Sequence, residues 1–335
     1  MAATVAILGA GSWGTALALH LARLGHEVTL WARTPAFAAE LARARENTVY
    51  LPGLAFPPNL RPVGELGEAC GSAEMVVWVC PSSAVRGLAQ AVRPCIHGRP
   101  LIVSAAKGVE QETRMTMSAV LAEVLGEDHQ ARVGALSGPS FAREVAHGVP
   151  TAATAAARDL TVAEAVQRLF SGQTFRVYTA TDVVGVEIGG AVKNVIAVAA
   201  GVSDGLGFGH NSRAALITRG LAEITRLAIR LGAERETLSG LSGLGDLVLT
   251  CTGDLSRNRT VGLRMGRGET LADIVASMKE VAEGVHNTRT VRDLARSVGV
   301  EMPITEQMYL LLYEGKSPRQ VVIDLMTRGL KRELD

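Results

Sequence analysis

The pattern of apolar and polar positions changes once along this chain. Up to about residue 180, short apolar runs typical of buried strands alternate with segments in which apolar residues recur at helical spacing. The strand-like runs cover residues 4–8, 27–31, 75–79, 101–104, 133–136, 151–154 and 175–178. Strands that alternate with helices build parallel sheets with helices on both faces, so we predict an α/β, doubly wound parallel sheet.

From about residue 181 only the helical spacing remains. It covers residues 183–202, 212–231, 270–277, 287–298, 304–313 and 318–329. We therefore predict two domains, an α/β domain over residues 1–180 and an all-helical C-terminal domain over residues 181–335. Within the first domain, the Pro- and Gly-containing clusters at residues 51–53 and 56–58 predict a loop.

A G-x-G-x-x-G motif joins the first predicted strand to the first predicted helix. In this position the motif indicates a Rossmann-type dinucleotide site, because each glycine has a separate task. Gly9 permits a tight turn, Gly11 leaves room for a pyrophosphate, and Gly14 lets helix and strand pack closely. The helix start adds unpaired backbone N–H groups for the phosphates. Trp13, inside the motif, either covers the cofactor or fills a gap.

The end of the second predicted strand bears on which cofactor binds. NAD-selective enzymes place an acidic residue there to hold the ribose 2′-hydroxyl. This chain has Arg33 at that point and no acidic residue until Glu40. A guanidinium can pair with a 2′-phosphate, so we predict that NADP(H) is preferred and that NAD(H) is also accepted. The alternative is that Arg33 is an ordinary solvated surface residue.

Lysine is rare in this chain, and two of the five lysines stand in apolar, glycine-rich surroundings. These are Lys107, at a predicted strand end, and Lys193, inside a predicted helix. Arginine stays charged near neutral pH, whereas a desolvated lysine can exchange a proton. A site that protonates a carbonyl oxygen during reduction therefore has reason to use lysine. The alternative for Lys193 is a helix lysine whose ammonium group lies in solvent.

Ser256, Arg257 and Asn258 combine a hydroxyl, a guanidinium and an amide beside a glycine. Such a group of donors suits a phosphate. Ser256 also suits the N-cap of a helix over residues 257–265, and both roles can hold at once. Asp246, judged by its neighbours alone, is an ordinary loop acid.

Composition narrows the function classes. A net charge of +1 argues against a nucleic-acid partner, which requires a clustered basic excess. The four cysteines lack C-x-x-C spacing, which suits buried thiols in a reducing cytoplasm. The seven histidines are scattered, and none pairs with a cysteine or an acidic residue at the spacing of metal ligands, so we expect no metal. We find no uninterrupted apolar run of about 18 residues and expect no stable membrane insertion.

Taken together, the motifs resemble those of the bacterial soluble glycerol-3-phosphate dehydrogenases over essentially the full length. The matching segments are residues 9–16, 137–142, 189–194, 244–247, 256–258 and 281–284. The resemblance implies reversible, NAD(P)H-dependent reduction of dihydroxyacetone phosphate to sn-glycerol 3-phosphate. This product supplies the backbone for phospholipid synthesis. Two family positions differ, with Ala106 in place of a frequent Thr and Ala282 in place of a frequent Val. Neither difference alters a charged residue.

Residue by residue, the resemblance implies that Lys193 is the catalytic proton donor or acceptor. It also implies that Lys107 is a second active-site cation near the substrate and the nicotinamide. The implied substrate residues are Lys107, Gly138, Ser140, Lys193, Asp246, Ser256, Arg257 and Asn258. The implied cofactor residues are Gly9, Gly11, Ser12, Trp13, Gly14, Arg33, Lys107, Ala142, Arg257, Val281 and Glu283.

Two other functions remain open on the sequence. One is a β-hydroxyacid dehydrogenase of similar architecture, although the Ser256–Asn258 segment and the two lysines count against it. The other is an NADP-sensing protein that binds the cofactor without turnover. The apolar helices after residue 181 fit either a homodimer interface or the core of a single chain.

Overall fold

The α/β half of the protein is built on one eight-stranded sheet. The computed structural model describes residues 2–278, 282–330 and 332–333. In spatial order the strands are β10 (Phe175–Ala180), β9 (Thr151–Ala157), β8 (Val133–Ser137), β7 (Leu101–Ser104), β6 (Met75–Trp78), β1 (Thr4–Leu8), β2 (Glu27–Trp31) and β5 (Leu60–Val63). From β8 to β5 all neighbours are parallel, so the carboxyl ends of β1, β6, β7 and β8 lie at one edge of the sheet.

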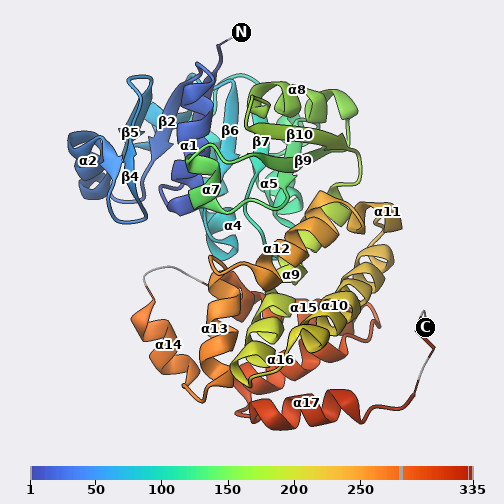
Figure 1. Ribbon diagram of the computed structural model, residues 1–335. Coiled ribbons are helices and arrows are strands. Elements are labelled where there is room, and N and C mark those ends of the chain that lie inside the picture. The colour runs from blue at the N-terminus through green and yellow to red at the C-terminus, as the bar shows by residue number, and fades with distance from the viewer. Residues whose placement is uncertain (1, 279–281, 331, 334–335) are drawn as a thin grey trace.

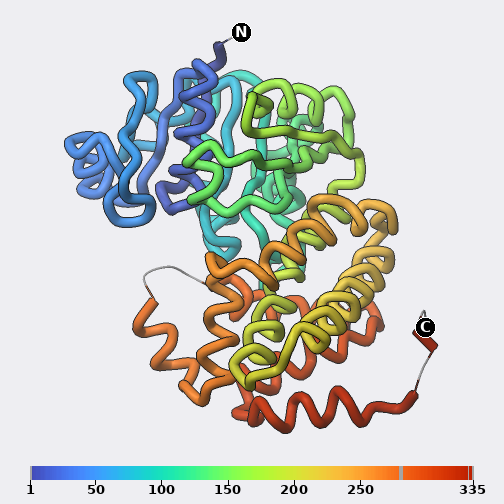
Figure 2. The backbone as a smooth tube through the Cα atoms, in the orientation of Figure 1, coloured from blue at the N-terminus to red at the C-terminus, as the bar shows by residue number. Residues whose placement is uncertain are grey.

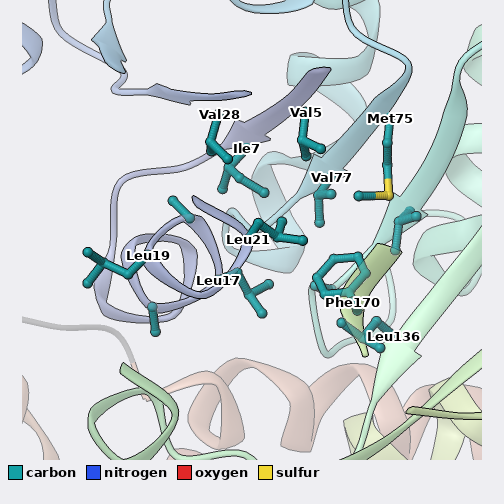
Figure 3. Packing of buried hydrophobic residues seen from close by; sticks show 14 of the residues in the cluster. Val5, Ile7, Leu17, Leu19, Leu21, Val28, Met75, Val77, Leu136 and Phe170 are labelled. Carbon is teal, nitrogen blue, oxygen red and sulfur yellow. The ribbon is translucent and has the colours of Figure 1, made fainter. Parts of the chain in front are cut away.

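Helices cover both faces of this sheet (Figure 1). They are α1 (Ser12–Arg23), α2 (Pro35–Ala44), α3 (Leu66–Cys70), α4 (Val85–Val92), α5 (Met117–Leu125), α6 (Glu127–Gln130), α7 (Ala142–Ala146) and α8 (Leu160–Phe170), with short 3₁₀ turns η1 (Ser82–Ala84) and η2 (Arg93–Cys95). Successive residues of β1 point to opposite faces. Val5 and Ile7 pack in a core with α1 and α8, whereas Ala6 and Leu8 pack in a second core with α3, α4 and α5. Figure 3 shows the first of these cores. Burial on both faces explains why the strands have continuous apolar runs.

The rest of the chain is helical, and Figure 2 shows its yellow-to-red trace separate from the sheet. Its elements are α9 (Val183–Gly205), α10 (His210–Arg230), α11 (Arg235–Leu238), the π-turn η3 (Leu241–Gly245), α12 (Asp246–Thr252), α13 (Arg257–Gly266), α14 (Leu271–Ser277), α15 (Glu283–Ser297), α16 (Pro303–Tyr313) and α17 (Pro318–Met326). Helix α9 is long and apolar enough to cross a membrane, but 89% of its most apolar window is buried inside the protein. It is the central helix of this half.

The structure corrects the expected strand pattern in two places. Strand β9 runs antiparallel to β8, because the 13-residue connection between them holds only the short helix α7, and a parallel return needs a crossover long enough to traverse the sheet. The predicted loop around residues 51–58 instead holds a hairpin of β3 (Glu46–Asn47) and β4 (Leu51–Ala55), followed by the edge strand β5. Local side-chain bonds such as that from the Gly53 N–H to Glu46 stabilise this hairpin despite its Pro and Gly content.

The change from sheet to helices falls between Ala180, the last residue of β10, and Val183, the first of α9. The division into domains at residues 1–180 and 181–335 stays a prediction.

Helices α9 and α13 pack with almost no space between their backbones. A Cβ added at Gly262 of α13 would lie 1.9 Å from the Val198 carbonyl oxygen of α9. Glycine at this crossing therefore lets α13 lie directly against α9, the helix that carries Lys193.

Candidate active site

The candidate site lies where the carboxyl edge of the sheet meets the helical half. Lys107 follows β7, and the segment from Gly138 to Ser140 follows β8. Lys193 comes from the middle of α9, and Asp246 is the first residue of α12. In open α/β sheets ligands bind at this edge, since several strand ends meet there.

A carboxylate bridges the two lysines. The Lys107 ammonium donates to Asp246 Oδ2 at 2.7 Å, and the Lys193 ammonium donates to Asp246 Oδ1. Asp246 is only 1% exposed. The interpretation of Asp246 as an ordinary loop acid is therefore wrong, because α12 begins at this residue and directs its carboxylate into the site. The neighbouring Gly-rich residues concealed this helix start in the sequence.

Lys193 is buried, with 6% exposure, so the alternative of a solvated ammonium is wrong. Besides Asp246, it donates to Thr250 Oγ1 at 2.8 Å. Burial lowers the pKa of Lys193 to about 8; Asp246 opposes this effect, and the nearby Lys107 ammonium adds to it. A lysine in this state can give or take a proton close to neutral pH.

Thr250 is a site residue that the sequence interpretation missed. It is buried on α12, four residues after Asp246, and its hydroxyl donates to the Asp246 carbonyl oxygen at 2.6 Å. The hydroxyl oxygen is thereby turned toward Lys193 as an acceptor. The spacing of four residues was the available signal, but it required knowing that a helix begins at Asp246.

The segment after β8 contacts Lys107 through its backbone. The Gly138 carbonyl oxygen accepts from Lys107 at 3.0 Å and from the Ser140 hydroxyl at 2.9 Å. Gly138 has φ +147°, and a Cβ there would lie 2.9 Å from Ala153, so a side chain would be both strained and crowded. The structure thus brings Gly138 and Ser140 to the same place as Lys107.

The Ser256–Asn258 segment caps and begins α13. The Ser256 hydroxyl accepts from the Arg259 N–H at 3.2 Å, which confirms the N-cap interpretation. Asn258 is buried and donates to Asn194 Oδ1 at 2.8 Å, while its own Oδ1 accepts from the Gly284 N–H at 2.9 Å. Asn258 therefore joins α13, α9 and α15. Asn194, which directly follows Lys193, is a second residue that the sequence interpretation missed.

The glycine turn fits a bound dinucleotide. Gly9 has φ +129°, and a Cβ at Gly14 would lie 1.8 Å from the Gly9 carbonyl oxygen, so these two glycines serve the turn and its packing. A Cβ at Gly11 would meet nothing within 4 Å, which leaves open space beside the turn. Helix α1 has neither a side-chain N-cap bond nor an acidic residue in its first turn. Its first N–H groups are therefore available to a phosphate.

The other predicted cofactor residues are placed around this turn and the adjoining elements. Ser12 and Trp13 begin α1, Ala142 begins α7, and the exposed Arg33 follows β2. The indole N–H of Trp13 is buried and has no hydrogen-bond partner among the residues that the structure describes. Val281 lies outside the described residues.

Glu283, at the start of α15, connects the helical half to the α/β half. Its carboxylate accepts from the Ser82 hydroxyl at 2.9 Å and from the Ser82 N–H at 3.3 Å. Burial raises the pKa of Glu283, an effect that the Ser82 bonds partly offset. Ser82 follows β6, so this contact brings Glu283 to the same sheet edge as the glycine turn.

Comparison with known proteins agrees with this arrangement. The N-terminal model of the NAD-dependent glycerol-3-phosphate dehydrogenases matches residues 4–163, and the C-terminal model matches residues 182–323. Relatives named glycerol-3-phosphate dehydrogenase, NAD(P)+, from Citrifermentans bemidjiense and Geobacter sulfurreducens are 54% and 55% identical over 333 residues, 99% of each chain. The chain belongs to this family. The predicted family, fold class and enzyme class are confirmed.

A solved structure shows the same fold. Glycerol-3-phosphate dehydrogenase from Coxiella burnetii has a TM-score of 0.93 at 41% identity and covers 98% of this chain and 99% of its own. Membership of the dehydrogenase family also counts against the β-hydroxyacid dehydrogenase alternative. The roles of individual site residues remain predictions.

Proposed function

We propose that this protein catalyses the reversible, NAD(P)H-dependent reduction of dihydroxyacetone phosphate to sn-glycerol 3-phosphate. The observation that carries the proposal is the buried Lys107–Asp246–Lys193 arrangement beside a glycine turn fit for a dinucleotide. Family membership supports the substrate. When bound, NAD(P)H supplies the hydride that reduces the ketone carbon.

In this mechanism Lys193 acts on the substrate oxygen. An ammonium has three N–H donors, and the bonds to Asp246 and Thr250 engage two of them. No other described residue accepts from the third, which can donate to the ketone oxygen, stabilise its developing negative charge and deliver the proton. A pKa of about 8 makes Lys193 acidic enough to give up that proton and basic enough to recover it.

Other residues bind and orient the substrate in the proposal. Lys107, held by Asp246 and the Gly138 carbonyl, adds a second positive charge beside Lys193. Arg257 projects from the first turn of α13, and a guanidinium at that position suits the phosphate. Within the described part of the chain, the Asn258 amide donates only to Asn194, which leaves one N–H for the substrate, and Ser140 supplies a hydroxyl. Ser256 contributes mainly as the N-cap that sets the direction of this turn.

We further propose that NADPH is preferred over NADH. Arg33 is exposed at the end of β2, where a 2′-phosphate would lie in this fold, and no acidic residue follows it in the sequence before Glu40. Replacing Arg33 by Ala should raise KM for NADPH by about tenfold, the effect of one lost charge-assisted contact, and leave KM for NADH nearly unchanged. Equal changes for the two cofactors would contradict this role.

The deciding experiment follows oxidation of NADPH and of NADH by the purified protein with dihydroxyacetone phosphate. Turnover by the parent protein supports the reaction. A rate at least ~10² lower in Lys193→Ala, with NADPH binding retained, supports the role of Lys193. Cofactor binding without turnover in the parent protein would instead support the sensor alternative. Parental turnover in Lys193→Ala would remove this lysine from the mechanism.

We also propose a cytoplasmic homodimer. Four free cysteines suit a reducing compartment. A groove of about 1180 Å³ between α10, α16 and α17 is lined mainly by apolar side chains, among them the exposed Phe208, Ile229 and Met326, and also by several arginines. Exposed apolar surface of this kind is typical of subunit interfaces. Light scattering that gives the mass of a single chain at micromolar concentration would contradict the dimer.

A further inference from the structure

Asn47 is a buried polar residue that has no role in the proposed mechanism. It belongs to the β3–β4 hairpin and has 0% exposure. Its amide donates to the Ala10 carbonyl oxygen at 3.0 Å and to Thr15 Oγ1 at 2.7 Å. Its Oδ1 accepts from the Tyr50 N–H at 3.0 Å. Both amide protons and the oxygen are therefore used, in bonds that join two separate segments.

One of these segments is the glycine turn itself. Ala10 lies between Gly9 and Gly11, and Thr15 is in the first turns of α1. The space beside Gly11 depends on the direction of this backbone, since a Cβ added at Gly11 would meet no described atom within 4 Å apart from those of the flanking residues. The two bonds from Asn47 fix the turn from the hairpin side.

The other segment is the tip of the hairpin. Tyr50 packs edge-on against Phe37 of α2, with ring centroids 5.8 Å apart and an interplanar angle of 88°. Helix α2 begins two residues after Arg33. The tip thus lies between the glycine turn, which suits the diphosphate, and the end of β2, which suits the adenosine ribose.

We propose that Asn47 is a positioning residue for the cofactor, which holds the dinucleotide turn and the Tyr50 tip in one geometry. It acts through the Ala10 carbonyl and the Tyr50 backbone and has no contact with the reacting atoms. The proposal rests on the NAD(P) dependence of this family. It predicts that loss of the Asn47 amide weakens cofactor binding but leaves the chemistry of Lys193 intact.

A matched control residue exists in the same half of the protein. Asn59 also donates twice from its amide, to the Ala22 carbonyl at 2.8 Å and to the His26 carbonyl at 2.7 Å. Ala22 is in the last turn of α1 and His26 follows the end of this helix, so both carbonyls lie away from the glycine turn. Asn59→Ala therefore removes the same number of side-chain donors without touching the cofactor site.

The test measures the Kd for NADPH by fluorescence titration, without substrate, in the parent, Asn47→Ala, Asn47→Asp and Asn59→Ala proteins. Asn47→Asp keeps the shape and the acceptor for Tyr50 but has no donor for Ala10. We expect Kd to rise about tenfold or more in both Asn47 variants and less than about twofold in Asn59→Ala, since a buried carbonyl left without its donor is costly. At saturating NADPH, the kcat of properly folded Asn47 variants should stay within about twofold of the parent.

Thermal unfolding separates this role from a purely structural one. If an Asn47 variant is too unstable at 25 °C, its midpoint is followed with and without NADPH, and the cofactor-induced rise should be smaller than in Asn59→Ala. Parental Kd values in both Asn47 variants, or an equal loss in Asn59→Ala, would overturn the proposal. Failure of the parent itself to bind NADPH would instead overturn the proposed function, and Asn47 would then have no cofactor to position.

Discussion

Replacing Asp246 by Asn tests whether the carboxylate between the two lysines tunes catalysis. Two ammonium groups lie against one buried carboxylate, and the substitution removes the charge with little change in shape. At an effective dielectric constant near 20, a charge about 4 Å away contributes about 4 kcal/mol. That energy corresponds to roughly a thousandfold in the protonation equilibrium of Lys193.

The sign of the change follows from the charges. In the parent, the pKa of Lys193 is about 8, so the group is mostly protonated at neutral pH. Without the carboxylate the ammonium loses its counter-charge while burial and Lys107 still disfavour it, so the pKa falls. The proton donor for ketone reduction is then largely absent at neutral pH. We expect kcat for reduction to fall by at least ~10² at pH 7.5.

The assay is the pH dependence of kcat for NADPH oxidation between about pH 6 and about pH 9. In the parent the rate of reduction should fall as pH rises through about 8. In Asp246→Asn the fall should begin below this range, so the rate should decline by about tenfold for each pH unit across most of it. Asp254→Asn is the matched control, because Asp254 is an exposed acid close by in sequence whose partner is Arg259, and it should leave the profile unchanged. An unchanged profile in Asp246→Asn, with protein that is folded by circular dichroism, would refute the reasoning.

Two further predictions concern stability. Gly262→Ala should cost about 1–3 kcal/mol in denaturant unfolding, because the new Cβ would lie 1.9 Å from the Val198 carbonyl oxygen. Gly87→Ala, in α4 with nothing within 4 Å, should instead stabilise by about 0.5–1 kcal/mol, and similar losses at both positions would contradict the packing argument. Burial raises the pKa of Glu223 from 4.5 to about 7, and this carboxylate accepts from the Ile304 N–H at 2.6 Å. The raised pKa favours the folded state at low pH, so stability should be lost as pH rises from about 4.5 through about 7, and Glu223→Gln should remove this dependence. A parental slope in that variant would exclude Glu223 as its source.

Local sequence determined much of this protein. The dinucleotide turn could be assigned to Gly9, Gly11 and Gly14 from the sequence alone. The tight turn, the space for a pyrophosphate and the close packing each require a residue without a side chain, and all three positions lie within six residues. The positions of the other strands, but not of β3, β4 and β5, and those of the large helices followed from apolar periodicity, which reports burial directly. Ser256 as an N-cap was also predictable, since capping uses residues three positions apart.

Only the tertiary structure decided the geometry of the candidate active site. Lys107, Lys193 and Asp246 come from three different elements, and the charge that each feels depends on the other two. Local sequence therefore left Lys193 undecided between solvent and core and made Asp246 an ordinary loop acid. The reversed direction of β9 and the contacts of Asn47 with the glycine turn were hidden for the same reason. Periodicity shows which face of an element is buried, whereas contacts between distant segments determine what lies against that face.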